Sequence, residues 1–148
     1  AALLHDVGRL VYMKIYPRYY ETVIAYQKSQ ECSLIDAELA LGVPSHTTMG
    51  AALANKWQLP EVIQDVCMNY HMTDPTAVPG SETQISFRRL VGTASRLIDL
   101  ANEALSTELR DRTRREVRKG LKITQSEFLG LMGEVYDLRA EADAFVQE

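Results

Sequence analysis

The sequence of 148 residues has little cysteine and no long hydrophobic run. Its two cysteines, Cys32 and Cys67, form no CxxC pair and lie far apart beside apolar helical positions, which is typical of reduced thiols in a cytosolic protein. No apolar run reaches the roughly 18 residues that a membrane span requires. The first residues lack the basic stretch and cleavage site of a signal peptide. We therefore expect a cytoplasmic protein with no membrane partner.

The sequence also lacks an excess of positive charge and most of the common catalytic motifs. The net charge is −4 and the isoelectric point is about 5.4, which argues against general binding of nucleic acid through its phosphates. We find no glycine-rich phosphate loop, no Ser-His-Asp order and no redox motif. The alternating pattern of β-strands, internal repeats and low-complexity tracts are missing as well. The pattern predicts an all-α protein.

Helical periodicity and capping signals divide the chain into segments. Ser33 with Asp36, and Thr124 with Glu127, have the spacing of capping boxes, and Gly42 suits the end of a helix. Helices are predicted over about 3–15, from Pro17 through at least Tyr26, and over 34–41, 46–57, 61–70 and 84–105. A basic stretch, RDRTRREVRKG, then ends at Gly120, and a final helix is predicted from Thr124 to near the end of the sequence. Because 148 residues is about the length of one domain, we expect one domain over residues 1–148. Residues 106–148 are expected to form peripheral helices of that domain.

The helical pattern also predicts which residues are buried. Met49 and Trp57 are expected in the core. In the helix after residue 84, the predicted inward face comprises Ile85, Leu90, Val91, Ala94, Leu97 and Ile98. The segment MTDPTAVPGSET is predicted to be a mobile surface loop. A basic cluster is interpreted as a solvated helical face, with binding of nucleic acid or an acidic partner as the alternative; it comprises Arg110, Arg112, Arg114, Arg115, Arg118 and Lys119.

The opening stretch AALLHDVGRL places His5 and Asp6 within an apolar run of helical spacing. Burying such groups is costly unless they are paired or coordinated. The residues alone therefore leave three interpretations open: a metal site, an internal hydrogen-bond pair, or the remnant of a former site.

Three motifs in order resemble the HDOD domain, the "HD-related output domain" branch of the HD superfamily. They are LLHDVGRL, then LGVPSHTTMGAALANKWQLPEVI, then the Tyr70-His71 pair before a DP loop. The resemblance implies an HD-superfamily-like helical bundle. It also implies a role in bacterial signalling beside receiver, kinase-like or cyclic-dinucleotide modules. Family members carry a helical portion before the LLHD motif, so we expect the sequence to lack the N-terminal part of its own domain.

The resemblance also implies a possible metal site. Active HD phosphohydrolases hold one or two divalent metals with an upstream histidine, the HD pair and a later aspartate, and the metal activates water for attack on a phosphoester. Here Ser95 stands where that aspartate is expected, and serine is a poor ligand for a catalytic metal. We therefore expect no catalytic residue and no metal; the ligand candidates, if a site survives, are His5, Asp6, His46 and His71.

Each candidate also has a purely structural interpretation. His46 suits a hydrogen-bonding role in the first turn of its helix, and His71 suits a helix C-terminal cap. Arg9 is expected at the surface or paired with a carboxylate, with contact to a phosphate as the alternative. We thus predict a non-catalytic regulatory module that acts through protein contacts. The alternatives are a metal-dependent phosphohydrolase acting on nucleotides or cyclic dinucleotides, and a nucleotide sensor without turnover.

Overall fold

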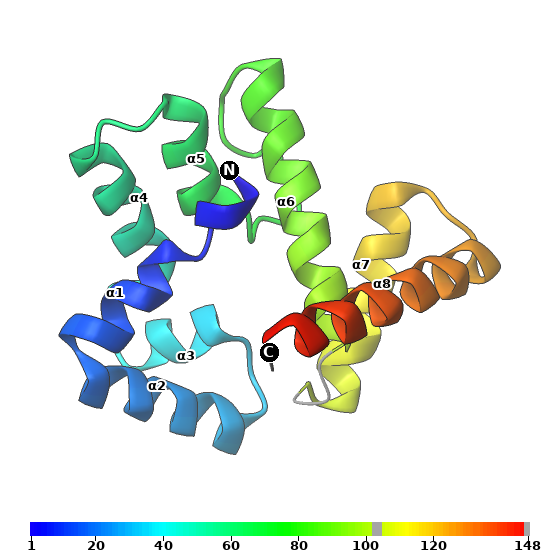
Figure 1. The fold of residues 1–148 in the computed structure, drawn as a ribbon, viewed down its shortest axis with the longest axis horizontal. Coiled ribbons are helices and arrows are strands. Elements are labelled where there is room, and N and C mark those ends of the chain that lie inside the picture. Colours follow the sequence, from blue (N-terminus) through cyan, green and yellow to red (C-terminus); the bar gives the residue numbers. More distant parts are fainter. Residues whose placement is uncertain (102–104, 147–148) are drawn as a thin grey trace. The chain divides into compact units, whose positions relative to one another are not determined.

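The computed structural model describes residues 1–101 and 105–146, and all regular structure within them is helical. The predicted all-α class is therefore confirmed. Figure 1 labels the α-helices in chain order, and a short 3-10 turn, η1, precedes them. The elements are η1 (Ala2–Leu4), α1 (Val7–Ile15), α2 (Pro17–Gln30), α3 (Leu34–Ala40), α4 (His46–Lys56), α5 (Glu61–Asn69), α6 (Glu82–Ala101), α7 (Thr107–Leu121) and α8 (Gln125–Val146).

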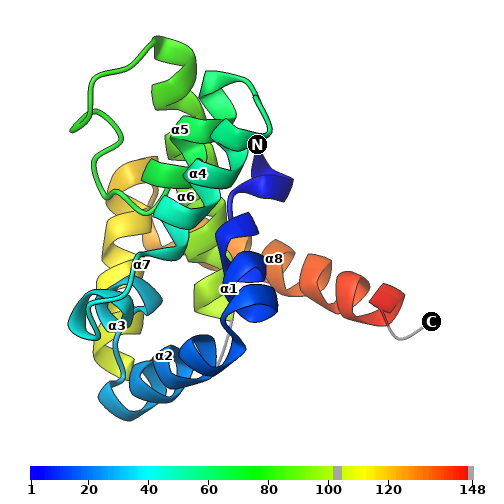
Figure 2. The ribbon, with the colours of Figure 1, turned by 90° about the vertical axis from the view of Figure 1, so that its left-hand side faces the viewer.

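The chain divides into two compact units, Ala1–Gly92 and Thr93–Glu148, and α6 runs through the boundary. In the first unit α4 packs against both α1 and α5, and α2 packs against α1 and α3. Figure 2 shows α1, α4 and α5 in this arrangement. Whether residues 1–148 behave as one domain stays a prediction. Among the described residues, no helix combines the length and hydropathy needed to cross a membrane.

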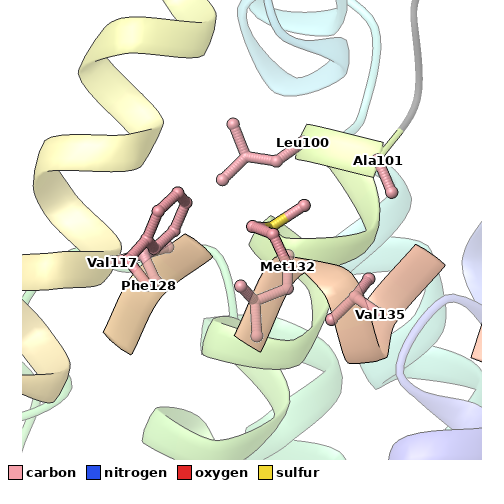
Figure 3. Close-up of a cluster of buried hydrophobic side chains, with 7 residues drawn as sticks. Leu100, Ala101, Val117, Phe128, Met132 and Val135 are labelled. Atoms are coloured by element: carbon pink, nitrogen blue, oxygen red, sulfur yellow. The ribbon is translucent and has the colours of Figure 1, made fainter. Parts of the chain in front are cut away.

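The second unit has its own apolar core, in which the end of α6 meets α7 and α8. Figure 3 shows Leu100, Val117, Phe128 and Met132 among the side chains that form it. The remaining buried members of this core are Leu97, Ala101 and Val135. Because all of these residues lie between 97 and 135, this core is assembled entirely from the C-terminal part of the chain.

The predicted local signals at helix ends are present. Ser33 is the N-cap of α3 and accepts the Asp36 backbone N–H, at 3.1 Å. At the start of α8, Glu127 accepts the Thr124 backbone N–H, at 2.8 Å. Pro17 occupies the first turn of α2, and Gly42 follows α3 with a left-handed φ of +66°. Such features are read correctly from sequence because their partners lie within four residues.

Several predictions about longer-range packing are wrong. The predicted helix over 3–15 is interrupted, because η1 ends at Leu4 and α1 begins at Val7. Trp57 follows α4 and is 54% exposed. On α6, Val91 and Leu97 are buried as predicted, but Leu90, Ala94 and Ile98 are exposed. Leu100 and Ala101, which were not predicted, are also buried. In each case the spacing of apolar residues fits a helix. The spacing alone does not determine which face of that helix packs against other helices.

The loop after α5, predicted to be mobile, is tied to α6 by a buried arginine. The guanidinium of Arg88 donates to the backbone carbonyls of Pro75, Val78 and Pro79, at 3.0, 2.6 and 3.2 Å. It also donates twice to the Asp65 carboxylate on α5, at 2.7 and 2.5 Å. Arg88 is 2% exposed, so one buried side chain holds the loop by three hydrogen bonds and α5 by two.

Candidate functional site

Asp6 lies at the break between η1 and α1, and both of its carboxylate oxygens are engaged. It is the N-cap residue of α1. The Tyr70 hydroxyl, at the end of α5, donates to Oδ1 at 2.5 Å. Arg9, one turn along α1, donates to Oδ2 at 2.9 Å. Asp6 therefore connects the start of α1 to the end of α5 through its side chain.

The pKa of Asp6 lies below its usual value. Burial by itself would raise this pKa, but the Tyr70 hydroxyl and the charge of Arg9 together outweigh burial and lower it. The pKa of Arg9 is raised: burial opposes this shift, and the hydrogen bond to Tyr20 and the pairing with Asp6 override it. The two groups are therefore held as an ion pair, as predicted for an arginine paired with a carboxylate.

His46, in the first turn of α4, is fully enclosed and paired with a buried carboxylate. Its Nδ1 lies 2.8 and 2.9 Å from the two carboxylate oxygens of Glu38 on α3. The His46 backbone N–H also donates to Glu38, at 3.1 Å. Both side chains are 1% exposed. Because a buried carboxylate without a donor is very costly, this pair fixes α3 against α4.

On its other side, His46 meets the same tyrosine that binds Asp6. Its Nε2 lies 3.0 Å from the Tyr70 hydroxyl and 3.1 Å from Nε2 of His71. The hydroxyl proton of Tyr70 is donated to Asp6, and the Tyr70 oxygen lies within hydrogen-bonding distance of His46 Nε2. A continuous polar chain thus runs from Glu38 through His46 and Tyr70 to Asp6 and Arg9; we call these five residues the polar chain.

The remaining two histidines lie against the ring of Tyr70. His5 makes an edge-to-face contact with it, with centroids 4.6 Å apart, and its Nδ1 lies 2.5 Å from the Ala2 carbonyl oxygen. His71 follows α5 and its ring lies 3.9 Å from that of Tyr70. The structure therefore gathers all four predicted candidates around one tyrosine. Nε2 of His5 and Oδ2 of Asp6 are 4.0 Å apart, so these two atoms are not hydrogen-bonded to each other.

A glycine in the first motif permits this convergence. A Cβ at Gly8 would lie 1.8 Å from the His46 carbonyl oxygen and 2.7 Å from the backbone nitrogen of Gly50. The backbones of α1 and α4 therefore touch at this point. Tyr12, one turn further along α1, donates its hydroxyl proton to the Pro44 carbonyl just before α4. These contacts bring Asp6 within 3.7 Å of His46.

Sequence reasoning missed two members of the polar chain, Glu38 and Tyr70. Glu38 lies in LIDAELAL, next to Ala37 and three residues before Leu41. A carboxylate on the inward face of an apolar helix is a signal that could have identified it. In the sequence, Tyr70 stands out only as part of the Tyr70-His71 motif. Its role depends on contacts 64 and 24 residues away in the chain, which no local pattern encodes.

The donor atoms do not form a metal centre as they are arranged. Within residues 1–101 and 105–146, no group of three or more His, Cys, Asp or Glu side chains is placed to hold an ion. The Tyr70 hydroxyl contacts both Oδ1 of Asp6 and Nε2 of His46, at 2.5 and 3.0 Å, and these two atoms are 3.7 Å apart. Ser95 is half-buried on α6 in the second unit. That the protein holds no metal stays a prediction.

The predicted basic cluster lies on α7 and is only partly solvated. Arg112, Arg114, Arg115 and Lys119 are exposed. Arg110 instead donates to the Leu100 carbonyl, at 3.0 Å, and helps to close the core of the second unit. Four of the six residues are therefore exposed as predicted, whereas Arg110 and Arg118 are half-buried.

A comparison with known protein families identifies the N-terminal half of the chain, which holds the polar chain. The HDOD domain family model matches residues 1–73, a stretch that contains every member of the polar chain together with His5 and His71. No curated protein and no solved structure matches the chain. Through residues 1–73, the chain belongs to the HDOD domain family.

Proposed function

We propose that this protein is a non-catalytic regulatory module of bacterial signal transduction, working in the cytoplasm through protein–protein contacts. The observation that carries the proposal is the Tyr70 hydroxyl bridging Asp6 and His46. An HD pair used for chemistry needs donor atoms available to a metal and substrate. Here both oxygens of Asp6, both ring nitrogens of His46 and Nδ1 of His5 contact neighbouring side chains or backbone, which favours a role in joining helices.

The polar chain gives a physical route for regulation. It connects α1, α3, α4 and the end of α5, so that displacing one of these elements breaks a buried polar contact with another. Buried polar networks of this kind tend to exist in discrete arrangements, because a partly satisfied network is unfavourable. An attached receiver, kinase-like or cyclic-dinucleotide module that moves one helix would thereby alter the surface that the others present to a partner.

The enzymatic alternative has one observation in its favour. Glu38 holds Nδ1 of His46 while Nε2 points toward Asp6 and His71. Metal-ligating histidines are commonly oriented by a carboxylate in this way. In this alternative a metal would have to displace or share the contacts of the Tyr70 hydroxyl with Asp6 and His46, at 2.5 and 3.0 Å.

A direct test combines metal content with turnover. We expect purified protein to hold no stoichiometric manganese, iron or zinc by mass spectrometry, and to show no hydrolysis of an aryl phosphodiester or a cyclic dinucleotide when these metals are added. The matched variants are Asp6→Asn and, as a control on the exposed face of α2, Glu21→Gln. Turnover that survives Glu21→Gln and disappears in Asp6→Asn would overturn the proposal in favour of a phosphohydrolase.

A second measurement separates the regulatory module from a nucleotide sensor. Calorimetric titration with cyclic dinucleotides is expected to give no heat of binding. Saturable heat that is lost in Arg9→Met would favour nucleotide sensing, since Arg9 is the cation nearest to Asp6 and the one suited to a phosphate.

A further inference from the structure

The second half of α8 contributes no buried side chain to its own unit. All ten residues from 136 to 145 are exposed, including Leu138 at 64% and Phe145 at 80%. Among the described residues, this segment makes a hydrogen bond from Arg139 to the Ala101 carbonyl and an Arg139–Asp143 ion pair at 3.6 Å. This half-helix therefore presents a broad free surface.

Three carboxylates follow that surface at helical spacing. Glu134, Asp137 and Glu141 occur at i, i+3 and i+7, which places them on one side of α8. All three are exposed, and within the described residues no cation lies within ion-pair distance of them. We call Glu134, Asp137 and Glu141 the acidic stripe. Leu138 and Phe145 lie beside it at helical spacing.

A matching set of cations lies at the end of α7. Arg115, Lys119 and Lys122 are exposed, and in the described part of the chain no carboxylate pairs with them. Lys119 lies in the last turn of α7 and Lys122 is its C-cap. We call these three residues the basic stripe. Other arginines of this helix do have acidic partners, as Arg114 has Asp111 at 3.3 Å and Arg112 has Glu116 at 3.9 Å.

The two stripes have the same spacing when one helix is reversed. The acidic stripe advances by three residues and then four, and the basic stripe, read backwards from Lys122, does the same. Four residues of helix span about 6 Å. An antiparallel approach therefore aligns Lys119 with Asp137 and Arg115 with Glu141. Lys122, the left-handed C-cap just past the end of α7, follows this alignment on the side of Glu134. The antiparallel approach also opposes the two helix dipoles, which is favourable.

From this match we infer that α7 of one copy docks on α8 of a second copy. The occupant of the basic stripe is the acidic stripe of another molecule of this chain. The protein's net charge of −4 argues against a nucleic acid as the occupant. Each copy carries one stripe of each sign, so the contact is head-to-tail and extends into chains unless it closes. The inference concerns the second unit and does not rest on the proposed function.

The experiment is sedimentation velocity on the full chain over a concentration series. At roughly 0.01 M salt, where charges act over about 30 Å, we expect the weight-average mass to rise with concentration. At roughly 1 M salt, where screening reduces this range to about 3 Å, we expect monomer. A monomer at every concentration in low salt overturns the inference.

Charge-reversal variants test whether the acidic stripe and the basic stripe mediate the association between copies. Arg115→Glu/Lys119→Glu and Asp137→Lys/Glu141→Lys are each expected to raise the dissociation constant by about tenfold or more, since two attractions become repulsions. Mixing the two variants is expected to restore association, because the reversed helices are again complementary. Restoration also shows that both variants are folded, and their circular dichroism provides a second check.

The matched control is Lys14→Glu/Lys28→Glu, which changes net charge equally at exposed positions of the first unit. It is expected to associate like the unmodified protein. If association weakens equally in this control, or if neither charge reversal weakens it, the association does not depend on the two stripes and the inference is overturned. A protein that stays monomeric but binds the polyanion heparin through Lys119 also overturns the inference.

Discussion

The Tyr70 hydroxyl lies 2.5 Å from Oδ1 of Asp6 and 3.0 Å from Nε2 of His46. One oxygen atom at the end of α5 therefore joins the HD pair at the start of α1 to the histidine at the start of α4. Its ring is buried, and both His5 and His71 lie against it. The tyrosine is the common neighbour of every residue that the sequence motifs single out as a candidate ligand.

Removing that single oxygen is expected to destabilise the fold. Tyr70→Phe keeps the ring but leaves Asp6 and His46 without their shared partner, which costs about 1–3 kcal/mol of unfolding free energy. Urea denaturation followed by circular dichroism measures this change. Tyr19→Phe, on the exposed face of α2, is the control and is expected to differ little from the unmodified protein. Equal stability of the two variants would show that the bridge contributes nothing.

The lowered pKa of Asp6 predicts a stability that depends on pH in the acid range. In the unfolded chain this carboxyl titrates near its usual value of 3.8, whereas in the folded protein it titrates below that. Its contribution is therefore fully present above the unfolded value and is lost as the pH falls through 3.8 toward the folded pKa. Other carboxyls with lowered pKa values, such as Asp74 and Glu127, add to the overall acid sensitivity.

The contribution of Asp6 is isolated by comparison with Asp6→Asn, which cannot titrate. We expect the difference in unfolding free energy between the two proteins to shrink as the pH is lowered from 6 through the unfolded value of 3.8. Chemical denaturation at a series of pH values measures it. A difference that grows on acidification would mean that Asp6 has a raised pKa in the folded protein, contrary to the geometry.

The parts of the fold that could be predicted from sequence are those fixed by near neighbours. The capping boxes at Ser33 and Thr124, the proline at the start of α2 and the left-handed Gly42 are all present. The break between η1 and α1 was not predicted. There, Asp6 is engaged by Tyr70 from across the unit, and this tertiary contact competes with continuation of a helix that the apolar spacing favours.

The candidate site was predictable as a set of residues but not as a network. The motifs identified His5, Asp6, His46 and His71, and the structure gathers them around Tyr70. The sequence did not reveal that Glu38 would be the buried partner of His46, because that pairing depends on how α3 is placed against α4. Nor did it reveal that His5 and Asp6 would face different neighbours instead of each other.

Substituting Gly8 is expected to be severely destabilising. In Gly8→Ala the added Cβ would overlap the His46 carbonyl oxygen, 1.8 Å away, and α1 and α4 would have to separate. Overpacking of this kind costs about 1–3 kcal/mol or more. Thermal denaturation measures the loss. The matched control is Gly130→Ala on α8, where an added Cβ meets nothing within 4 Å and helix propensity predicts a gain of about 0.5–1 kcal/mol. A Gly8→Ala protein as stable as its parent would contradict the close contact between the helices.

Arg88 is expected to control both stability and protection of the loop after α5. Arg88→Met removes the guanidinium from the Asp65 carboxylate, which keeps the Asn69 amide as a donor, and from three loop carbonyls. Breaking a buried charge pair in this way costs about 3–5 kcal/mol. Arg88→Lys retains the charge but not the fork of donors that reaches Asp65 and the loop together, so it is expected to recover only part of the loss. Arg89→Met, at an exposed position of α6, is the control.

Limited proteolysis distinguishes the loop from the rest of the unit. In the Arg88 variants we expect new cleavage within residues 72–81 under conditions that leave the unmodified protein and Arg89→Met intact. This follows because the loop carbonyls would no longer be held by a buried donor. Cleavage elsewhere in the first unit, with 72–81 still protected, would mean that Arg88 stabilises the contact between α5 and α6 and that the loop is held by other interactions.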